Sequence, residues 1–263
     1  MPALRWTGLT LLTLGYGMAL AYGYLNLFAS LSIALLIMAG LCVSQFSDTY
    51  VRAFGHGLFL LLALALATHW LPGFYSARVI AGVRFTPEAA PFSMYLNLDK
   101  PLIGFWILWI CPWVLTRTGF TRSAIVSTIA LVATSTACML AAVSLGMITW
   151  APKWPAQSGL WIVNNLLLVT LTEELLFRGY IQGGFHRLFK QLPYGSGLAI
   201  AAAATVFGLA HMGAGWQWVL LSGFAGIGYG LAYRFGGFQA AVITHFGLNL
   251  VHFSLFTYPM FDR

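Results

Sequence analysis

The sequence predicts an all-α membrane protein, a polytopic transmembrane helical bundle with about eight to nine spans. Two observations predict this class. Of the 263 residues, 60% are hydrophobic and only 7% are charged, which is too little polar surface for a soluble protein of this length. Uncharged stretches also cover residues 6–47, 191–233 and 235–261, and each is long enough for one or two spans of ~20 residues. The chain is therefore expected to be a multi-pass protein whose surface contacts the lipid bilayer.

Polar interruptions divide the apolar stretches into predicted helices. These helices cover 7–24, 28–46, 54–71, 101–116, 123–148, 160–189, 196–212, 216–234 and 238–257. The first resembles a signal peptide because Arg5 precedes an apolar run and Ala19-Leu20-Ala21 resembles a cleavage site. Further spans follow at once, so we interpret it as the first helix.

The net charge of +7 does not indicate a nucleic-acid partner, because the basic residues stand singly near helix ends and form no stripe. They are better interpreted as topology signals. With the N-terminus inside, the cytoplasmic set is Arg5, Arg52, Arg117, Arg122, Arg187, Lys190 and Arg234, and the external set is Arg78, Arg84, Lys100, Lys153 and Arg263. The expected location is a membrane, and we expect it to be the bacterial inner membrane.

The chain divides into two predicted parts. Residues 1–122 form an N-terminal transmembrane scaffold with few inward polar side chains. Their external loop 72–100 contains a weak alternation of apolar and polar residues, which predicts an interfacial hairpin. We interpret this loop as a spacer rather than a lid. Residues 123–263 form the catalytic core, because ionisable and amide side chains there lie inside apolar helices. The isolated Cys42, Cys111 and Cys138 support neither a disulfide framework nor a CxxC metal site.

Small residues recur every fourth position in the predicted helix 216–234. Ser222, Gly226 and Gly230 share one face of this helix, on which another helix can pack closely. We interpret this face as structural.

The adjacent acids Glu173 and Glu174 lie in the middle of an apolar helix, where the bilayer disfavours charge. Arg178 follows Glu174 by four residues, so the two can pair on one helical face. Glu173 is rotated by about 100° from Glu174 and points elsewhere. Glu173 is therefore the candidate general base, and Glu174 with Arg178 supports the helix. The alternative is that both acids only hold the bundle together.

Polar residues on two later helices complete a candidate site. His211 lies near the end of the predicted helix 196–212, and a lone intramembrane histidine is weak evidence by itself. His245 and Asn249 share a face at i,i+4 spacing, and His252 continues the stripe. His245 and Asn249 supply donors suited to an oxyanion, and His211 with Glu173 could position a water. This set indicates a hydrolase.

Three motifs in this order resemble the CPBP family of intramembrane proteases, which includes CAAX endopeptidases and bacteriocin self-immunity proteins. The family pattern is EExxxR, FxxxH and HxxxN, and the chain has Glu173-Glu174-Leu-Leu-Phe-Arg178, Phe207-Gly-Leu-Ala-His211 and His245-Phe-Gly-Leu-Asn249. The resemblance covers about residues 160–258. It implies a glutamic-type intramembrane endopeptidase without a cofactor, acting on a membrane-associated protein or peptide.

The resemblance also implies the role of each residue. Glu173 and His211 activate water, while His245 and Asn249 form the oxyanion site. A zinc ion held by Glu173, His211 and His245 is the alternative that we consider less favoured, because the sequence lacks a HExxH pair.

The rise of about 1.5 Å per helical residue places these side chains at different depths in the membrane. Glu173 and His245 come out ~10 Å from the cytoplasmic side and His211 ~22 Å from it. For the three to meet, the helix 196–212 must be strongly tilted or residues 193–197 must be submerged.

Two other functions remain open at this point. A proton-coupled transporter could use the same acids and histidines as a relay, although the sequence shows no repeated halves. A non-catalytic scaffold or immunity protein could bind another membrane protein through the face of Gly226 and Gly230. No residue identifies the substrate.

Overall fold

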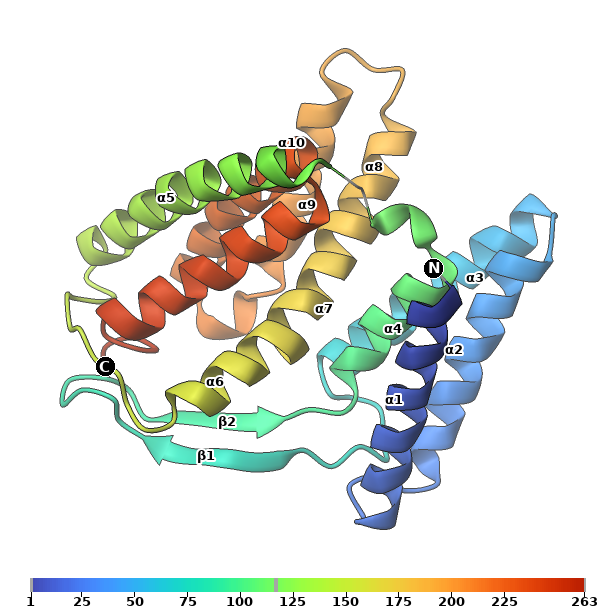
Figure 1. The fold of residues 1–263 in the computed structure, drawn as a ribbon, viewed down its shortest axis with the longest axis horizontal. Coiled ribbons are helices and arrows are strands. Elements are labelled where there is room, and N and C mark those ends of the chain that lie inside the picture. Colours follow the sequence, from blue (N-terminus) through green and yellow to red (C-terminus); the bar gives the residue numbers. More distant parts are fainter. Residues whose placement is uncertain (1, 116–117, 263) are drawn as a thin grey trace. The chain divides into compact units, whose positions relative to one another are not determined.

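The computed structural model describes residues 2–115 and 118–262, with side chains at residue 10 and from residue 12 onward. The chain is mostly helical and contains one two-stranded sheet (Figure 1). It divides into two compact units. The first unit holds the described residues up to 79 together with 95–112, and the second holds 80–94 together with those from 113 onward.

The first unit is a small helical bundle. It contains α1 (Pro2–Ala21), α2 (Phe28–Gln45), α3 (Thr49–Ala67) and α4 (Lys100–Ile110). Asp48 begins α3 as its N-cap, because its side chain accepts a hydrogen bond of 2.9 Å from the Val51 N–H. Trp106 of α4 stacks on Phe59 with ring centroids 3.8 Å apart and donates its indole N–H to the Leu36 carbonyl. These contacts join α2, α3 and α4.

The second unit is built from α5 and three later helical segments. α5 covers Phe120–Ser144. A continuous rod over residues 158–188 consists of α6 (Ser158–Asn164), η2 (Asn165–Thr170), α7 (Leu171–Glu174), η3 (Leu175–Gln182) and α8 (Gly183–Leu188). α9 (Gly195–Leu209), the short 3-10 turn η4 (Met212–Ala214) and α10 (Trp216–Leu255) follow. The 3-10 turn η1 (Pro112–Val114) precedes α5 and begins at the last residue of the first unit. α10 packs against α5 and α9.

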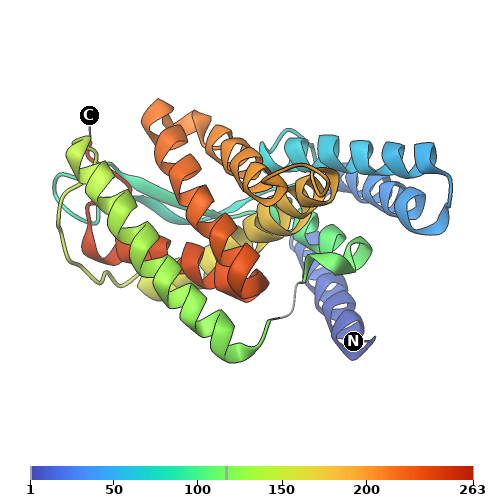
Figure 2. The ribbon, with the colours of Figure 1, turned by 90° about the horizontal axis from the view of Figure 1, so that it is seen from above.

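α10 is broken at Gly237, where the backbone adopts φ 80° and ψ −175°. This combination is essentially restricted to glycine. The two halves of α10 therefore run in different directions from the break (Figure 2). Two side chains satisfy the carbonyls that the break exposes, because Thr118 donates to the Gly236 carbonyl and Arg122 to the Phe235 carbonyl.

The face of Ser222, Gly226 and Gly230 packs against α9, as predicted. A Cβ at Gly226 would lie 3.1 Å from the Ala204 Cα, and a Cβ at Gly230 would lie 2.8 Å from Ile200. Gly228 has the same role against α5, where a Cβ would lie 2.1 Å from the Thr134 hydroxyl. Small residues on α10 thus let it approach both neighbours closely.

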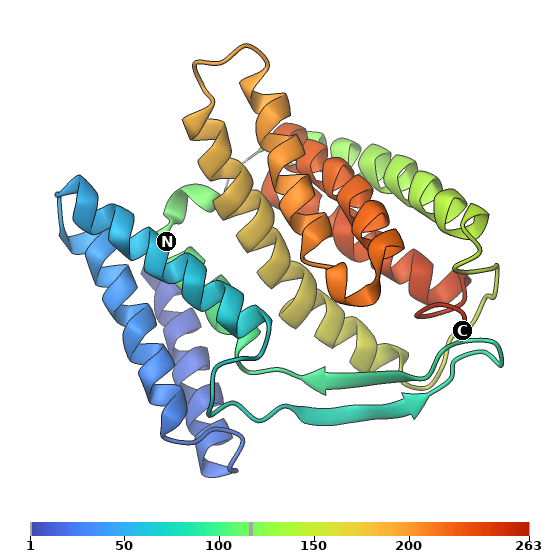
Figure 3. The ribbon, with the colours of Figure 1, turned by 180° about the vertical axis from the view of Figure 1, so that it is seen from behind.

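The predicted hairpin is present as β1 (Ala77–Val83) and β2 (Phe92–Leu96), and its place at the membrane interface stays a prediction. Within the second unit, the C-terminal segment pairs with the hairpin tip (Figure 3). The Ala90 N–H donates to the Met260 carbonyl at 2.9 Å, and Arg84 forms an ion pair of 2.5 Å with Asp262.

A helix lies at each of the predicted spans, but four helices in the described part of the chain are long and apolar enough to cross a membrane. They are Phe28–Gln45, Thr49–Ala67, Phe120–Ser144 and the rod Ser158–Leu188. α4 and α9 are shorter, so the predicted eight to nine spans are not confirmed. The predicted division at residue 122 stays a prediction about function, since the compact units divide the chain differently.

Candidate active site

The two glutamates lie in a short α-helical turn between two π-helical segments. α7 ends at Glu174, with η2 before it and η3 after it. A π-helical turn widens the backbone and is often found at functional sites. Here it sets the directions in which the side chains of residues 165–182 leave the rod.

Glu174 and Arg178 form the predicted pair. The Glu174 carboxylate lies 3.3 Å from the Arg178 Nε, and both side chains are fully buried. Isolated charges at such a position are strongly disfavoured, so each requires the other. The predicted supporting role of these two residues stays a prediction.

Aromatic rings enclose the Arg178 guanidinium. Its Cζ lies 4.5 Å from the centroid of Phe207 on α9 and 5.2 Å from that of Tyr229 on α10. Phe207 is also packed against Phe177, with centroids 5.0 Å apart. The first position of the FxxxH motif therefore serves as a cation–π partner of the arginine in the EExxxR motif.

His245 is held by Glu174 as well. Its Nδ1 lies 2.8 Å from the second Glu174 carboxylate oxygen, and its ring stacks on Tyr229 with centroids 4.4 Å apart. Because the carboxylate only accepts, Nδ1 carries a proton and Nε2 points away from Glu174. Glu174 thus holds two cationic or polar partners, whereas the sequence assigned it only Arg178.

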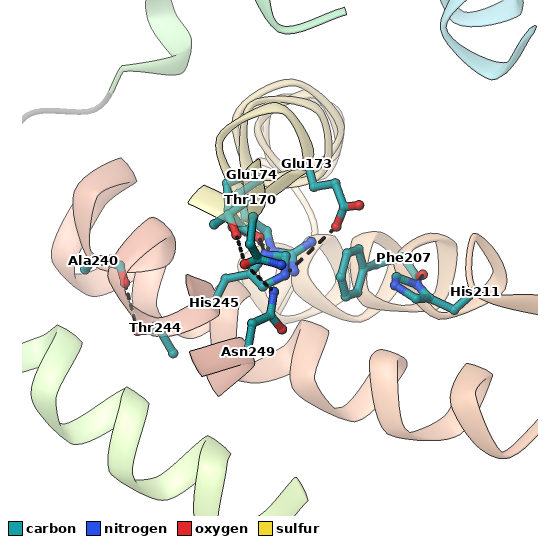
Figure 4. A network of polar contacts seen from close by, with 11 residues as sticks. Thr170, Glu173, Glu174, Phe207, His211, Ala240, Thr244, His245 and Asn249 are labelled. Carbon is teal, nitrogen blue, oxygen red and sulfur yellow. Dashed lines mark hydrogen bonds and ion pairs between the residues drawn. The ribbon is translucent and has the colours of Figure 1, made fainter. Parts of the chain in front are cut away.

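Glu173 points to the opposite side of the same histidine (Figure 4). Its carboxylate lies 3.9 Å from the His245 Nε2, and its side chain is 26% exposed. This distance is an ion-pair separation and is too long for a hydrogen bond. Glu173 is therefore the carboxylate of the pair that water can reach.

His211 follows the end of α9 and turns back onto it. Its Nδ1 lies 2.9 Å from the Phe207 carbonyl, so Nδ1 carries the proton and the Nε2 lone pair is free to accept. The Phe207 ring lies 4.8 Å from the His211 ring and 5.7 Å from that of His245 (Figure 4). The three motifs therefore converge despite the depth that helix rise assigns to His211. No contact among the described side chains joins Glu173 directly to His211.

Asn249 is oriented by Asn165, which lies outside the three motifs. The Asn249 Nδ2 donates to the Asn165 Oδ1 at 3.2 Å, and Thr170 donates to the same oxygen at 3.3 Å. Asn165 is the first residue of the π-helical η2. The consecutive amides Asn164 and Asn165 inside a predicted span were a usable signal, because amides there require partners.

A cavity of about 100 Å³ adjoins the converging motifs. His211, His245 and Asn249 line it, together with apolar side chains such as Met139, Met147 and Leu248. Glu173 is not among the lining residues. His252 also borders this cavity, but its Nε2 lies 3.2 Å from the Thr257 carbonyl, which gives it a packing role at the end of α10.

The catalytic type, glutamic or zinc-dependent, stays a prediction. Among the residues that the structure describes, no three His, Cys, Asp or Glu side chains form a group that could hold a metal ion. Glu173 and His245 are near each other, while the Phe207 ring lies between His245 and His211 (Figure 4).

Residues 155–251 match the family model described as type II CAAX prenyl endopeptidase Rce1-like. This segment is Rce1-like. The match confirms the family resemblance that the three motifs predict, and that family consists of membrane proteases. The Rce1-like segment contains the whole rod from α6 to α8, α9 and most of α10. No significant match was found among curated proteins or among solved structures.

Proposed function

We propose that the protein is an intramembrane endopeptidase that hydrolyses a peptide bond of a membrane-associated protein or peptide by a metal-free mechanism. The observation that carries this proposal is the convergence of three helical segments on His245. Glu174 binds one side of its ring, Glu173 faces the other, and His211 and Asn249 border the same cavity. The Rce1-like match of residues 155–251 supports the same class of reaction.

Glu173 is assigned as the general base. A water between Glu173 and His211 would donate one hydrogen to the Glu173 carboxylate and the other to the free His211 Nε2 lone pair. The oxygen of this water then attacks the carbonyl carbon of the scissile bond as Glu173 accepts its proton. General base catalysis of this kind contributes about 10²–10⁴-fold to the rate.

His245 and Asn249 are assigned to the oxyanion that forms. The second N–H of the Asn249 amide remains available after its bond to Asn165. A protonated His245 would balance the charge of Glu173, Glu174 and Arg178, and its Nε2–H could then donate to the oxyanion. Glu174 orients the ring in the way that a carboxylate orients a catalytic histidine.

Collapse of the intermediate completes the reaction. The C–N bond breaks, the oxyanion returns to a carbonyl, and Glu173 transfers its proton to the leaving amine. Glu174 and Arg178 touch no reacting atom in this scheme, so they act through His245 and the packing of the rod. A bacterial inner membrane is the proposed location.

The test compares cells that produce the wild-type protein, Glu173→Ala or the control variant Glu88→Ala. Membrane and secreted fractions are analysed for protein termini. We expect at least one terminus that depends on the wild-type protein, is absent with Glu173→Ala and is retained with Glu88→Ala. Normal cleavage of that substrate by purified Glu173→Ala would overturn the proposal.

A further inference from the structure

A second pocket, separate from the candidate active site, lies where α8, α9 and the break in α10 meet. Its volume is about 340 Å³, within the range of pockets that bind small ligands. Three basic side chains line it, His186, Arg187 and Arg234, and no carboxylate does. None of the ion pairs between described residues involves Arg187 or Arg234. The pocket is therefore positively charged.

One residue that lines the pocket carries a buried polar atom that has no hydrogen-bond partner among the described residues. Gln182 is only 4% exposed and lines the pocket. Its Nε2 donates to the Gly230 carbonyl at 3.0 Å, which fixes the amide orientation, and its buried Oε1 accepts no hydrogen bond from any described residue. A ligand that fits this pocket should therefore present a hydrogen-bond donor as well as a negative charge.

The helix break contributes to the same site. Gly237 lines the pocket, and the second half of α10 begins immediately after it. The positive end of that helix dipole thus lies beside the pocket. The carbonyls of the first half of α10 oppose this potential, and the Arg122 guanidinium, which donates to the Phe235 carbonyl, brings a positive charge that offsets them.

Exposed apolar side chains flank the basic residues. Leu188, Tyr194 and Phe235 are 70%, 90% and 50% exposed. Trp113 lines the pocket, and the Arg187 guanidinium lies 4.9 Å from its ring centroid. Tryptophan beside arginine at the end of apolar helices is typical of the lipid headgroup level.

We infer that this pocket binds the phosphate of a phospholipid headgroup. Arg187 and Arg234 bind the phosphate oxygens, and the Gln182 Oε1 accepts a hydrogen from the hydroxyl or ammonium group of the headgroup. The acyl chains then lie along the exposed apolar side chains. This inference does not rest on the proposed protease function, because the pocket shares no lining residue with the cavity at His245.

The experiment measures thermal unfolding of the full chain in detergent. Phosphatidylglycerol, a diacylglycerol with the same acyl chains, or inorganic phosphate is added. We expect phosphatidylglycerol to raise the midpoint by about 2–5 °C, and diacylglycerol to leave it unchanged. The double variant Arg187→Gln/Arg234→Gln should lose this response. Lys190→Gln should retain it, since Lys190 carries a nearby charge but does not line the pocket.

Other changes of the unfolding midpoint would contradict the lipid site in different ways. An undiminished response in the double variant, or an equal response to diacylglycerol, would overturn the site. An equal response to millimolar inorganic phosphate would support a phosphate site but overturn its assignment to a lipid. If the double variant does not fold, the two single variants replace it, and each should lose about half of the response.

Discussion

Glu173 and Glu174 are neighbours in the chain but differ in burial and in the side of His245 that each one faces. Glu174 is fully buried between Arg178 and His245. Glu173 is partly exposed, and its only ion-pair partner among the described residues is His245 at 3.9 Å. A substitution that removes the charge should therefore have different consequences at the two positions.

Glu173→Gln should lower the turnover rate at least about 100-fold and leave the unfolding midpoint unchanged, because Gln cannot accept the proton of water. Glu174→Gln should lower both the rate and the free energy of unfolding, the latter by up to about 3–5 kcal/mol, because Arg178 is left as a buried unpaired charge. Peptide cleavage and thermal unfolding of the purified variants measure the two effects. Equal effects of the two substitutions on both quantities would contradict the division of roles.

At this scale the motif spacing indicates candidate residues but not the contacts that they make across helices, and the catalytic roles of these residues stay predictions. The motif spacing selected Glu173, Glu174, Arg178, His211, His245 and Asn249, and the structure brings them together. The motif spacing did not indicate that Asn165 and Tyr229 join them, or that Phe207 of the FxxxH motif packs against Arg178. Those contacts form between side chains on different helices, and the periodicity of one helix contains no information about its partner.

Among the helices, the break in α10 has the clearest role. The second half of α10 carries His245 and Asn249, while the first half carries Tyr229. Gly237 sets the angle between the halves with backbone angles that other residues rarely adopt. The position of His245 and Asn249 relative to Tyr229 thus depends on one glycine.

Gly237→Ala should lower the free energy of unfolding by about 1–3 kcal/mol, because alanine is strained at a positive φ. It should also lower peptidase activity, since His245 and Asn249 move with the second half of the helix. The matched control is Gly184→Ala in α8, where an added Cβ meets no atom within 4 Å. Denaturant unfolding and a cleavage assay on both variants test this prediction, and a Gly237→Ala protein as stable and active as the control would contradict it.

The helix boundaries were largely predictable, whereas the irregular turns were not. Apolar stretches with charged residues at their ends predict the position of each helix, because a helix that spans the hydrocarbon core needs a long apolar segment. The π-helical turns η2 and η3 and the break at Gly237 arise from tertiary packing that no apolar pattern encodes. The predicted count of eight to nine spans is not confirmed, since α4 and α9 are shorter than the apolar stretches that contain them.

At the scale of the second unit, the C-terminal segment holds distant loops together. It bonds to the hairpin tip through Met260 and Asp262 and to the loop after α5 through Thr257, whose N–H donates to the Thr149 carbonyl. Lys153 in that loop donates to the Phe256 carbonyl. Burial lowers the pKa of Lys153 from 10.5 to about 8, and nearby Glu88 partly opposes this shift.

This lowered pKa gives stability a defined pH dependence. Between about pH 8 and 10.5 the unfolded chain binds more protons at Lys153 than the folded chain, so this residue makes the folded state more stable as the pH rises. Below pH 8 the cost of burying the charged amine is present in full. The unfolding midpoint of the wild type minus that of Lys153→Met should therefore increase over this window. A difference that stays flat or falls would contradict the prediction.

The enclosure of Arg178 also constrains how the protein can be made. The ribosome delivers the rod 158–188 before α9 and α10, which supply Phe207 and Tyr229. Placing a lone arginine or acid at the centre of a nascent span disfavours its membrane insertion by about 2.5–3.5 kcal/mol. We therefore expect the rod to become fully stable in the bilayer only after the following two helices have emerged. The aromatic rings that enclose Arg178 would then link the insertion of the rod to the synthesis of α9 and α10.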